Sequence, residues 1–386
     1  MRPVKVLHLI KTLDLGGAEL NLFNLVRATS PEDVDCHVGY SSGGLIEEMF
    51  RKEGAKLFKF AEGFHKVKSL ASIVIICRII KYIRAHEIDI VHTHNFSAHA
   101  WGAVAAKLAG VKLVEHVHDL RYEESGLLVR NRIKASHYRL SWFFAKFSDV
   151  IIVLTEGNKR FLTERGICPE EKIRVMLNGI PLDGAPPADT SGIRKRIGVP
   201  EDARIVLSAG RISFEKNMGM VLDIASSLKG KYTGVVFVIA GDGPLKEDLE
   251  RSASEKGLDK EVRFIGFYPD IPELLGIAEL FLLPSFLELH SITMLEAMSM
   301  RVPALVSRGA GCNDDFITDG VNGLLLETDN ADRWCEAVSR LLDDPHLAKN
   351  IADKGRELVE KRCDIKDTVK AIEGVYSDLC GARGEN

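Results

Sequence analysis

The stretch Pro284-Ser-Phe-Leu-Glu288-Leu-His-Ser-Ile-Thr-Met-Leu-Glu296-Ala-Met-Ser-Met-Arg-Val-Pro303 carries the clearest fold signal in the chain. The apolar run 280–283 before it predicts a buried parallel strand that ends at Pro284. Apolar residues after it recur at helical spacing, so we expect Glu288 in a strand-to-helix loop and Glu296 on the helix. Ligands of open parallel sheets bind beyond the carboxyl ends of the strands, which makes Glu288 a candidate site residue.

The spacing of these two glutamates limits their chemistry. Eight positions along a helix correspond to about 800° of rotation, so the two carboxylates would lie roughly 80° apart around the axis. That arrangement does not suit the facing acid and nucleophile of a hydrolase, whereas separate contacts on one elongated ligand do suit it. The alternative is that Glu296 belongs to the solvated side of an amphipathic helix.

Outward from this stretch, strand and helix patterns alternate along the whole chain. Two such series are separated by residues 181–190, which are rich in Pro, Gly and small polar residues. Strict alternation predicts two doubly wound α/β domains, each a parallel sheet with helices on both faces. The crevice shared by two such domains is the default ligand site. In the first series we expect a helix over 69–86 with Ile73, Ile76, Ile80 and Ile83 on one face.

Composition fits this organisation. The 386 residues are 46% hydrophobic and 27% charged, which is ordinary for a globular chain of two domains. Residues 1–184 carry 26 Lys and Arg against 21 Asp and Glu, whereas residues 185–386 carry 25 against 34. The net charge of −4 therefore hides a basic first half and an acidic second half. Neither charge nor motif supports nucleic-acid binding.

The cysteines and the amino-terminal residues indicate a compartment. The seven cysteines form no C-x-x-C pair and no grouping with histidines at metal-ligand spacing, so we expect free thiols and no metal site. Residues 1–10 have the pattern of a strand and lack that of a signal peptide. No stretch approaches the roughly 20 apolar residues of a membrane-spanning helix. The expected location is the cytoplasm.

A basic and aromatic stretch in the first domain adds a second expectation. Residues 127–147 combine arginines and lysines with Trp142, Phe143, Phe144 and Phe147 on one predicted helix. Basic and aromatic residues on one helix can mark a peripheral contact, here with the inner membrane face or with an anionic acceptor. The alternative is an ordinary helix with one solvated face and one core face.

Three features of the first domain fall at predicted strand ends. Gly16 and Gly17 follow the first strand and open a helix, but their spacing differs from the G-x-G-x-x-G fingerprint, and a plain tight turn explains them equally well. His94 and His118 end two further strands and are site candidates. The alternative for each histidine is that it satisfies hydrogen bonds within a loop.

Three loops of the second domain predict one composite site. Arg211 and Lys216 place two cations around a turn after a strand, an arrangement suited to binding a diphosphate without a metal. The loop 240–244 contains Gly241 and Gly243, which allow close approach of backbone to a flat ligand such as a base. The third loop holds Glu288, His290 and Ser291. Together these loops predict a site for a nucleotide with two phosphates and a further polar group.

At this point the chain resembles the GT-B glycosyltransferases of family 4, the retaining enzymes that use nucleotide sugars. The resemblance extends over essentially the whole chain, and its motifs keep the family's order. These motifs are Gly16-Gly-Ala-Glu19, Asn178-Gly179, Gly210-Arg211 to Lys216, Gly241-Asp-Gly-Pro244, Pro284-Ser285, the Glu288/Glu296 pair and Asp319-Gly-Val-Asn-Gly323-Leu.

The resemblance implies roles for individual residues. Arg211 and Lys216 would bind the diphosphate and stabilise the departing nucleotide, Glu296 would bind the ribose, and Glu288 would bind the donor sugar. His118 matches the family's histidine on the first domain and completes the implied catalytic set of Arg211, Lys216, Glu288 and His118. The implied donor site also contains Gly16, Gly17, Gly210, Gly241, Gly243, His290, Ser291 and Ile292. No cofactor or metal is implied, because fixed cations act on the charge that grows on the leaving diphosphate.

Two departures from the family pattern bear on the donor sugar. Leu289 and His290 stand where the family has glycine and an aromatic residue after the first glutamate, and Asp315 stands where it has a later glutamate. Loss of the glycine removes a freely left-handed backbone position and adds bulk beside the sugar. These departures bear on which donor sugar is used more than on the reaction.

The resulting hypothesis is a retaining, metal-independent glycosyltransferase with a UDP-sugar donor preferred over GDP. Its acceptor would be a hydroxyl of a glycan, a lipid-linked molecule or a small molecule. Residues 1–184 would form the acceptor domain, residues 185–365 the donor domain, and residues 366–386 a helix that crosses back to the first domain. The rivals are a GT-B sugar-nucleotide epimerase and a catalytically impaired nucleotide-sugar-binding scaffold.

Overall fold

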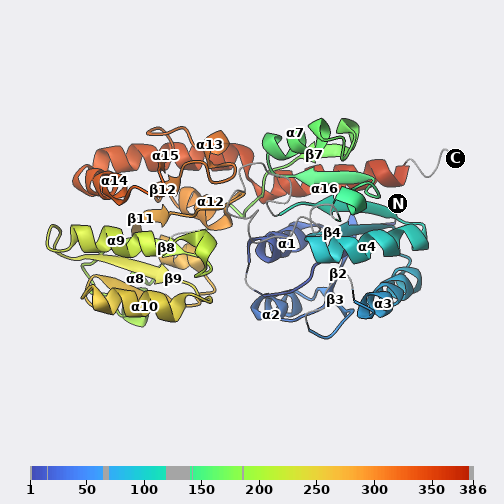
Figure 1. The fold of residues 1–386 in the computed structure, drawn as a ribbon, viewed down its shortest axis with the longest axis horizontal. Helices are drawn as coiled ribbons and strands as arrows, with labels where there is room; N and C mark the ends of the chain where they lie inside the picture. The colour runs from blue at the N-terminus through green and yellow to red at the C-terminus, as the bar shows by residue number, and fades with distance from the viewer. Residues whose placement is uncertain are drawn as a thin grey trace. The chain divides into compact units, whose positions relative to one another are not determined.

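The computed structural model describes residues 2–14, 16–63, 69–118, 140, 142–184 and 187–381. The chain divides into two compact units, the first formed by Met1–Gly179 with Ile365–Asn386 and the second by Ile180–Asp364. Each unit contains its own parallel sheet, which confirms the expected pair of doubly wound α/β folds. Figure 1 shows the helices and strands with the labels used below.

The first unit is built on a sheet of seven strands within the described residues, in the order β3-β2-β1-β4-β5-β6-β7. Its strands are β1 (Val4–Leu9), β2 (Val34–Tyr40), β3 (Lys56–Lys59), β4 (Ile90–Thr93), β5 (Lys112–His116), β6 (Val150–Val153) and β7 (Ile173–Val175). Its helices are α1 (Gly17–Ala28), α2 (Leu45–Lys52), α3 (Ala71–His86), α4 (Phe96–Ala109), α7 (Glu156–Glu164) and α16 (Ile365–Gly381), with a short 3₁₀ turn at Glu170–Lys172.

The second unit has six strands in its described part, in the order β10-β9-β8-β11-β12-β13. They are β8 (Arg204–Ala209), β9 (Val235–Ala240), β10 (Val262–Gly266), β11 (Ala278–Leu283), β12 (Ala304–Ser307) and β13 (Leu324–Leu326). Its helices are α8 (Thr190–Ile197), α9 (Gly219–Leu228), α10 (Lys246–Glu255), α11 (Ile271–Leu275), α12 (Ile292–Ser299), α13 (Asn313–Phe316), α14 (Ala331–Asp343) and α15 (Pro345–Arg362), with a 3₁₀ turn η3 (Phe214–Lys216).

Local sequence explains most of these elements. The strand β9 reads Val-Val-Phe-Val-Ile-Ala and is buried at every position, as expected of a parallel strand covered on both faces. Asn95, Thr155 and Asn330 each accept a backbone N–H bond at a helix start, and α15 begins with Asp344 as cap and Pro345 as first residue. These caps fix where the helices begin and hence where the preceding loops end.

The expected helix is present as α3, and the face that it buries is offset from the row Ile73, Ile76, Ile80 and Ile83. The helix buries Ser72, Ile75, Ile79 and Ile83, whereas Ile73 is 63% exposed. Ile76 and Ile80 lie at the margin of the core that α3 forms with α4. The run of four apolar residues at 73–76 is compatible with two helical faces, so sequence periodicity alone does not choose between them.

The last helix belongs to the first unit, although the whole second unit precedes it in sequence. In Figure 1, α16, red at the end of the colour scale, lies among blue and green elements. Ile372 and Val375 of α16 pack with Val6 and Ile90 of the sheet, and the Tyr376 hydroxyl bonds to His92 Nδ1. A Cβ on Gly179 would lie 2.8 Å from the Cα of Ile365, so glycine is required where the chain passes the start of α16.

The predicted basic and aromatic helix over 127–147 lies largely outside the described residues. Of this stretch only Leu140 and residues 142–147 are described. Trp142 is partly buried against the core of the first unit, whereas Phe143 is 54% exposed. None of the helices in the described part of the chain has the length and apolar character needed to cross a membrane.

Candidate functional site

The second unit places two candidate loops on either side of the point where its strand order reverses. Strand β8 continues toward β9 on one side, and β11 begins the return toward β12 on the other. The loop after β8 carries Arg211 and Lys216, and the loop after β11 carries Glu288. In open α/β sheets this switch point, at the carboxyl ends of the strands, is where ligands bind.

The two loops are joined by an ion pair and by their backbones. Lys216 Nζ pairs with Glu288 Oε2, and the side chains are 21% and 13% exposed. The backbone N–H groups of Phe286 and Leu287 donate to the Glu215 carbonyl, over 2.8 and 3.3 Å. The fold therefore holds together Lys216 and Glu288, which are 72 residues apart in sequence. Arg211, on the same loop as Lys216, is exposed.

Glycines in the neighbouring loops are required by close backbone packing. A Cβ on Gly241 would lie 1.9 Å from the Gly210 carbonyl oxygen, and one on Gly243 would lie 2.3 Å from that of Ile212. Both glycines have positive φ, at 152° and 159°. From the sequence, these glycines are expected to admit a flat ligand. The structure gives them a further reason, because the loops after β8 and β9 meet backbone to backbone.

Glu296 lies on α12, as predicted, and its environment is unusual for a carboxylate. Its Oε2 atom is buried and has no hydrogen-bond partner among the described residues. Burial, with a smaller contribution from the charge of Asp270, raises the pKa of Glu296 to about 8. A buried acceptor without a donor costs free energy, so a ligand hydroxyl that donates to it would be favoured.

The residues between the two glutamates point into the core of the second unit. Leu289 and His290 are 6% and 3% exposed, and the His290 ring packs edge-on against Phe316. Burial and the charge of Arg362 lower the pKa of His290 to about 3, so it is neutral at physiological pH. Ser291 caps α12 by accepting from the Met294 N–H, and Ile292 is the first residue of that helix and buried.

The departures from the family pattern differ in their burial, since Leu289 and His290 are buried in the second unit and Asp315 is exposed. Among the described residues, positive φ at a non-glycine position occurs only at Glu87, Asn217 and Arg301, so Leu289 carries no left-handed strain. Asp315 is exposed on α13. The bulk of Leu289 is accommodated in the core of this unit.

The candidates of the first unit lie at the carboxyl ends of its central strands. Gly16 caps α1 in an extended conformation, and a Cβ on Gly17 would meet nothing within 4 Å. His94 follows β4 and is fully buried, and His118 follows β5 and is partly buried. Their imidazoles are neighbours, with 3.3 Å between His94 Nδ1 and His118 Nε2.

Sequence reasoning missed the other members of this histidine group. His8, His92 and His116 join His94 and His118 in a continuous set of ring contacts. The available signal was an H-x-H pattern at the ends of two consecutive strands, 92–94 and 116–118. The two candidates were weighed one at a time, although the register of parallel neighbours brings such positions together.

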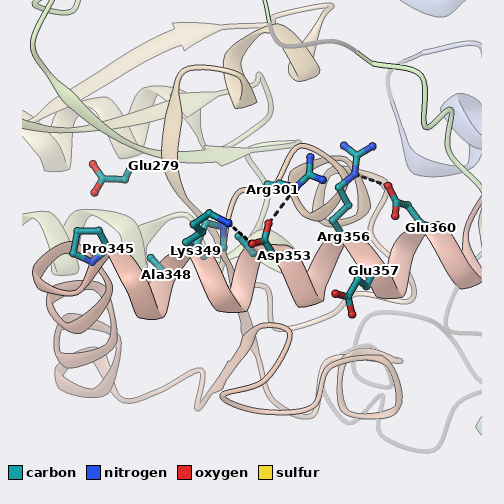
Figure 2. A pocket seen from close by; sticks show the side chains of 11 residues that line it. Glu279, Arg301, Pro345, Ala348, Lys349, Asp353, Arg356, Glu357 and Glu360 are labelled. Atoms are coloured by element: carbon teal, nitrogen blue, oxygen red, sulfur yellow. Dashed lines mark hydrogen bonds and ion pairs between the residues drawn. The ribbon is translucent and has the colours of Figure 1, made fainter.

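A cavity of about 740 Å³ lies elsewhere in the second unit, as Figure 2 shows. It is lined by α15 together with Glu279, at the start of β11, and Arg301 and Pro303, just before β12. Its cations are already paired, Arg301 and Lys349 with Asp353 and Arg356 with Glu360. Because Glu279, Arg301 and Pro303 lie at or before the starts of β11 and β12, the cavity lies at the amino ends of the strands. Ligands of such sheets bind at the opposite edge.

Comparison with known proteins assigns both units to one enzyme class. The family model described as "Glycosyltransferase Family 4" matches residues 15–183, and that of "Glycosyl transferases group 1" matches residues 189–358. A UDP-Gal:alpha-D-GlcNAc-diphosphoundecaprenol alpha-1,3-galactosyltransferase of Escherichia coli is 30% identical over 320 residues, covering 81% of this chain and 80% of the relative. This chain belongs to the family 4 glycosyltransferases.

Further similarities agree with this family membership. An alpha-D-kanosaminyltransferase of Streptomyces kanamyceticus is 28% identical and covers 75% of this chain and 77% of its own length. The crystal structure of HepE from Anabaena in complex with UDP and glucose superimposes with a TM-score of 0.84. At 22% identity, with 97% of this chain and 99% of HepE covered, that likeness shows the GT-B fold. The expected fold and enzyme class are thus confirmed.

Proposed function

We propose that this glycosyltransferase moves a sugar from a UDP-sugar to an acceptor hydroxyl with retention of configuration and without a metal ion. The observation that carries the proposal is the pairing of Lys216 with Glu288 at the switch point of the second unit. One loop contributes cations, which bind a diphosphate, and the other contributes a carboxylate, which binds sugar hydroxyls. A nucleoside-diphosphate sugar requires both groups side by side at the ligand edge of the sheet. The further clauses of the proposal rest on the family resemblance and on the named relatives.

In this proposal the Lys216–Glu288 pair is the resting state of the donor site. A diphosphate that reaches Lys216 replaces Glu288 as its counter-ion, and the carboxylate becomes free to accept hydrogen bonds from sugar hydroxyls. Arg211 adds a second, exposed cation from the same loop. As the glycosidic bond breaks, negative charge grows on the diphosphate and positive charge on the sugar, so fixed cations stabilise the transition state more than the ground state. No metal is needed for that stabilisation.

Glu296 would bind the ribose of the nucleotide. Its buried Oε2 lacks a donor among the described residues, and a ribose hydroxyl supplies one. The family resemblance implies that Gly17 would lie under the phosphates, that Gly16 belongs to the donor site and that His118 belongs to the catalytic set. Our proposal adds that His118 contacts the donor sugar. The preference for UDP over GDP is supported by the UDP-Gal of the Escherichia coli relative's name and by the UDP bound to HepE.

The acceptor we favour is lipid-linked, with a glycan or a small molecule as the other classes. The named relative from Escherichia coli acts on a diphosphoundecaprenol acceptor. Within the described residues of the first unit, one face of α3 and its cap is exposed. It is made of Leu70, Ile73, Val74 and Cys77 followed by Arg78, Lys81 and Arg84. This helix contains no acidic residue, so the face combines apolar insertion with attraction to anionic lipid headgroups.

The deciding experiment is nucleotide binding to the full chain by thermal shift and calorimetry. UDP, GDP and ADP are compared on wild type, on Glu296→Ala and on Glu250→Ala, a matched control at an exposed position of α10. UDP at about 100 times its Kd should stabilise wild type and the control by about 2.7 kcal/mol, and Glu296→Ala should lose that gain. Absence of any nucleotide effect on wild type would contradict the donor site.

Turnover separates the proposal from its two rivals. Incubation of a bound UDP-sugar with acceptor candidates should release UDP, and the anomeric configuration of the product, read by NMR, should match that of the donor. Conversion of the UDP-sugar to an isomer without an acceptor would identify an epimerase. Nucleotide-sugar binding that is never followed by UDP release across the acceptor classes would identify a scaffold.

A further inference from the structure

Five histidines meet at the carboxyl edge of the first unit's sheet, outside the groups assigned to the diphosphate. His8 comes from β1, His92 and His94 from the end of β4, and His116 and His118 from the end of β5. These three strands are neighbours in the parallel sheet, and His8 is in register with His92. The fold therefore gathers residues that are separated by more than 80 positions in sequence.

Two pairs of imidazole nitrogens in this group lie at hydrogen-bond distance, and others lie somewhat farther apart. His8 Nδ1 is 3.0 Å from His94 Nε2, and His94 Nδ1 is 3.3 Å from His118 Nε2. The rings of His116 and His118 lie with their centroids 4.0 Å apart. The nitrogens that His94, His116 and His118 offer all lie within 4.8 Å of one another.

His116 differs from the rest of the group in the state of its two ring nitrogens, since His8 and His92 each have one buried nitrogen without a partner among the described residues. It is 2% exposed, and both of its ring nitrogens are buried without a hydrogen-bond partner among the described residues. A neutral imidazole has one donor and one acceptor, so two polar atoms are left unsatisfied. Buried polar groups in folded proteins are nearly always satisfied, and an ion is one of the regular explanations when no protein partner is present.

We propose that His94, His116 and His118 bind a divalent transition-metal ion of the zinc type. Imidazole nitrogen is a preferred ligand of Zn²⁺, Co²⁺ and Ni²⁺. Zinc binds histidine at about 2.0–2.1 Å in tetrahedral geometry, which places ligand nitrogens about 3.4 Å apart. The His94–His118 spacing of 3.3 Å already fits that geometry, and rotation of the His116 ring would supply the third ligand and satisfy one of its nitrogens. The fourth position is left for water.

The protonation state and the supporting contacts suit this site. Burial holds the pKa values of His94 and His116 well below 6.5, so both rings are neutral near pH 7, the form that binds metals. With Nδ1 of His94 on the ion, its Nε2–H donates to His8 Nδ1, which fixes the ring orientation. A second triad, His8, His92 and His94, is completely buried, whereas His118 is partly exposed and offers a path for the ion.

The ion would oppose the transfer reaction instead of assisting it, a consequence that rests on the proposed function. There His118 contacts the donor sugar, and with Nε2 on the ion its ring would be fixed and only Nδ1 would be left for a hydroxyl. Binding of the ion itself needs only residues of the first unit, and it can be measured without any sugar donor. Failure of the donor site would leave the metal measurement unaffected.

The test uses the full chain without a polyhistidine tag, freed of metal with a chelator and with its thiols alkylated. Titration with Co²⁺, followed by visible absorption, should show the d–d bands of a tetrahedral site that saturate at one equivalent. Calorimetry with Zn²⁺ should give the same stoichiometry. Alkylation blocks the accessible thiols as ligands, whereas Cys168, Cys312 and Cys363 are buried. An unchanged visible spectrum of the wild-type chain on addition of Co²⁺ would overturn the proposal.

Variants locate the ion within the histidine group. Loss of a residue that supports a metal ligand weakens metal binding by roughly 10- to 100-fold, and His8→Gln should weaken Co²⁺ binding to that extent. His116→Gln and His118→Gln each remove a ligand and should weaken Co²⁺ binding by more than this. His346→Gln, at an exposed position of α15, should bind like wild type. His118→Gln changes a partly exposed side chain, so its fold can be verified by circular dichroism. Undiminished binding by folded His118→Gln would overturn the proposal.

Discussion

Glu296 shows how one side chain ties stability to pH in this enzyme. The folded-state pKa of about 8 lies above the ordinary value of 4.5, because the carboxylate is buried. The folded state therefore holds this proton more tightly than the unfolded state does. Its contribution to the free energy of unfolding is complete below about pH 4.5 and is lost as the pH rises toward about 8.

Replacing Glu296 with glutamine should remove this pH dependence. Near pH 5 the variant and wild type should have similar free energies of unfolding, since wild type is then protonated and equally neutral. Near pH 8.5 the variant should be the more stable by about 1–3 kcal/mol. Urea denaturation across this range measures the difference, with the exposed Glu250→Gln as control. Parallel pH profiles of Glu296→Gln and wild type would contradict the raised pKa.

At the scale of elements, the position of Glu288 depends on a glycine in the following loop. Gly311 has φ of 60°, and a Cβ there would lie 1.5 Å from the Glu288 carbonyl oxygen. The Cys312 N–H donates to the Leu289 carbonyl, so the loops after β11 and β12 lie backbone against backbone. The loop that carries Glu288 is thus held by backbone contacts with the loops after β8 and β12, and these contacts position its ion pair with Lys216.

Gly311→Ala should displace the Glu288 loop and impair the donor site. Gly309→Ala is a matched control, since Gly309 has φ of 70° in the same loop and nothing lies within 4 Å of its Cβ position. Both variants should lose about 1 kcal/mol of stability to the left-handed backbone. Only Gly311→Ala should also weaken UDP binding in calorimetry, by about tenfold or more for a loss of at least 1.4 kcal/mol. Equal UDP affinity in the two variants would show that the contact does not position the site.

The exposed face of α3 should bind anionic membranes. Sedimentation with vesicles that contain an anionic phospholipid should pull down the wild-type enzyme, and added salt should weaken the binding. Ile73→Asp and Val74→Asp place charge in the apolar half of the face and should release the enzyme. Val321→Asp, at another exposed apolar position, should not. Binding that is the same for all four proteins would exclude α3 as the contact.

At the scale of the whole molecule, the two units differ in how the chain builds them. The second unit is one continuous segment, Ile180–Asp364, whereas the first needs α16 from the far end of the chain. Val369, Ile372 and Val375 of α16 complete an apolar core with Val6 and Val114 of the sheet. Without α16 that surface of the sheet would be exposed to water.

The fragment 180–364 should fold alone and bind UDP, because it contains Arg211, Lys216, Glu288 and Glu296 together with its own core. The fragment 1–179 should not unfold cooperatively, because its sheet lacks the cover of α16. Chemical denaturation and UDP calorimetry on both fragments measure these outcomes. Cooperative unfolding of 1–179 would show that α16 is dispensable for that unit.

The sequence by itself determined the alternation of strands and helices, the parallel sheets, the loops that hold Arg211, Lys216 and Glu288, and the helix that carries Glu296. These features depend on local periodicity and on turn residues, which are patterns among residues only a few positions apart in the sequence. Family motifs added the reaction class. The sequence did not determine which face α3 buries, because the run of four apolar residues at 73–76 is compatible with more than one helical face.

The tertiary structure alone decided which of these loops meet. Lys216 reaches Glu288 because β8 and β11 are neighbours in the sheet, and the five histidines converge because β1, β4 and β5 are neighbours. Burial of the Glu296 carboxylate and of both His116 nitrogens likewise follows from packing between distant segments. Local sequence patterns do not specify strand order or the environment of a side chain, since both are set by contacts between residues far apart in the chain.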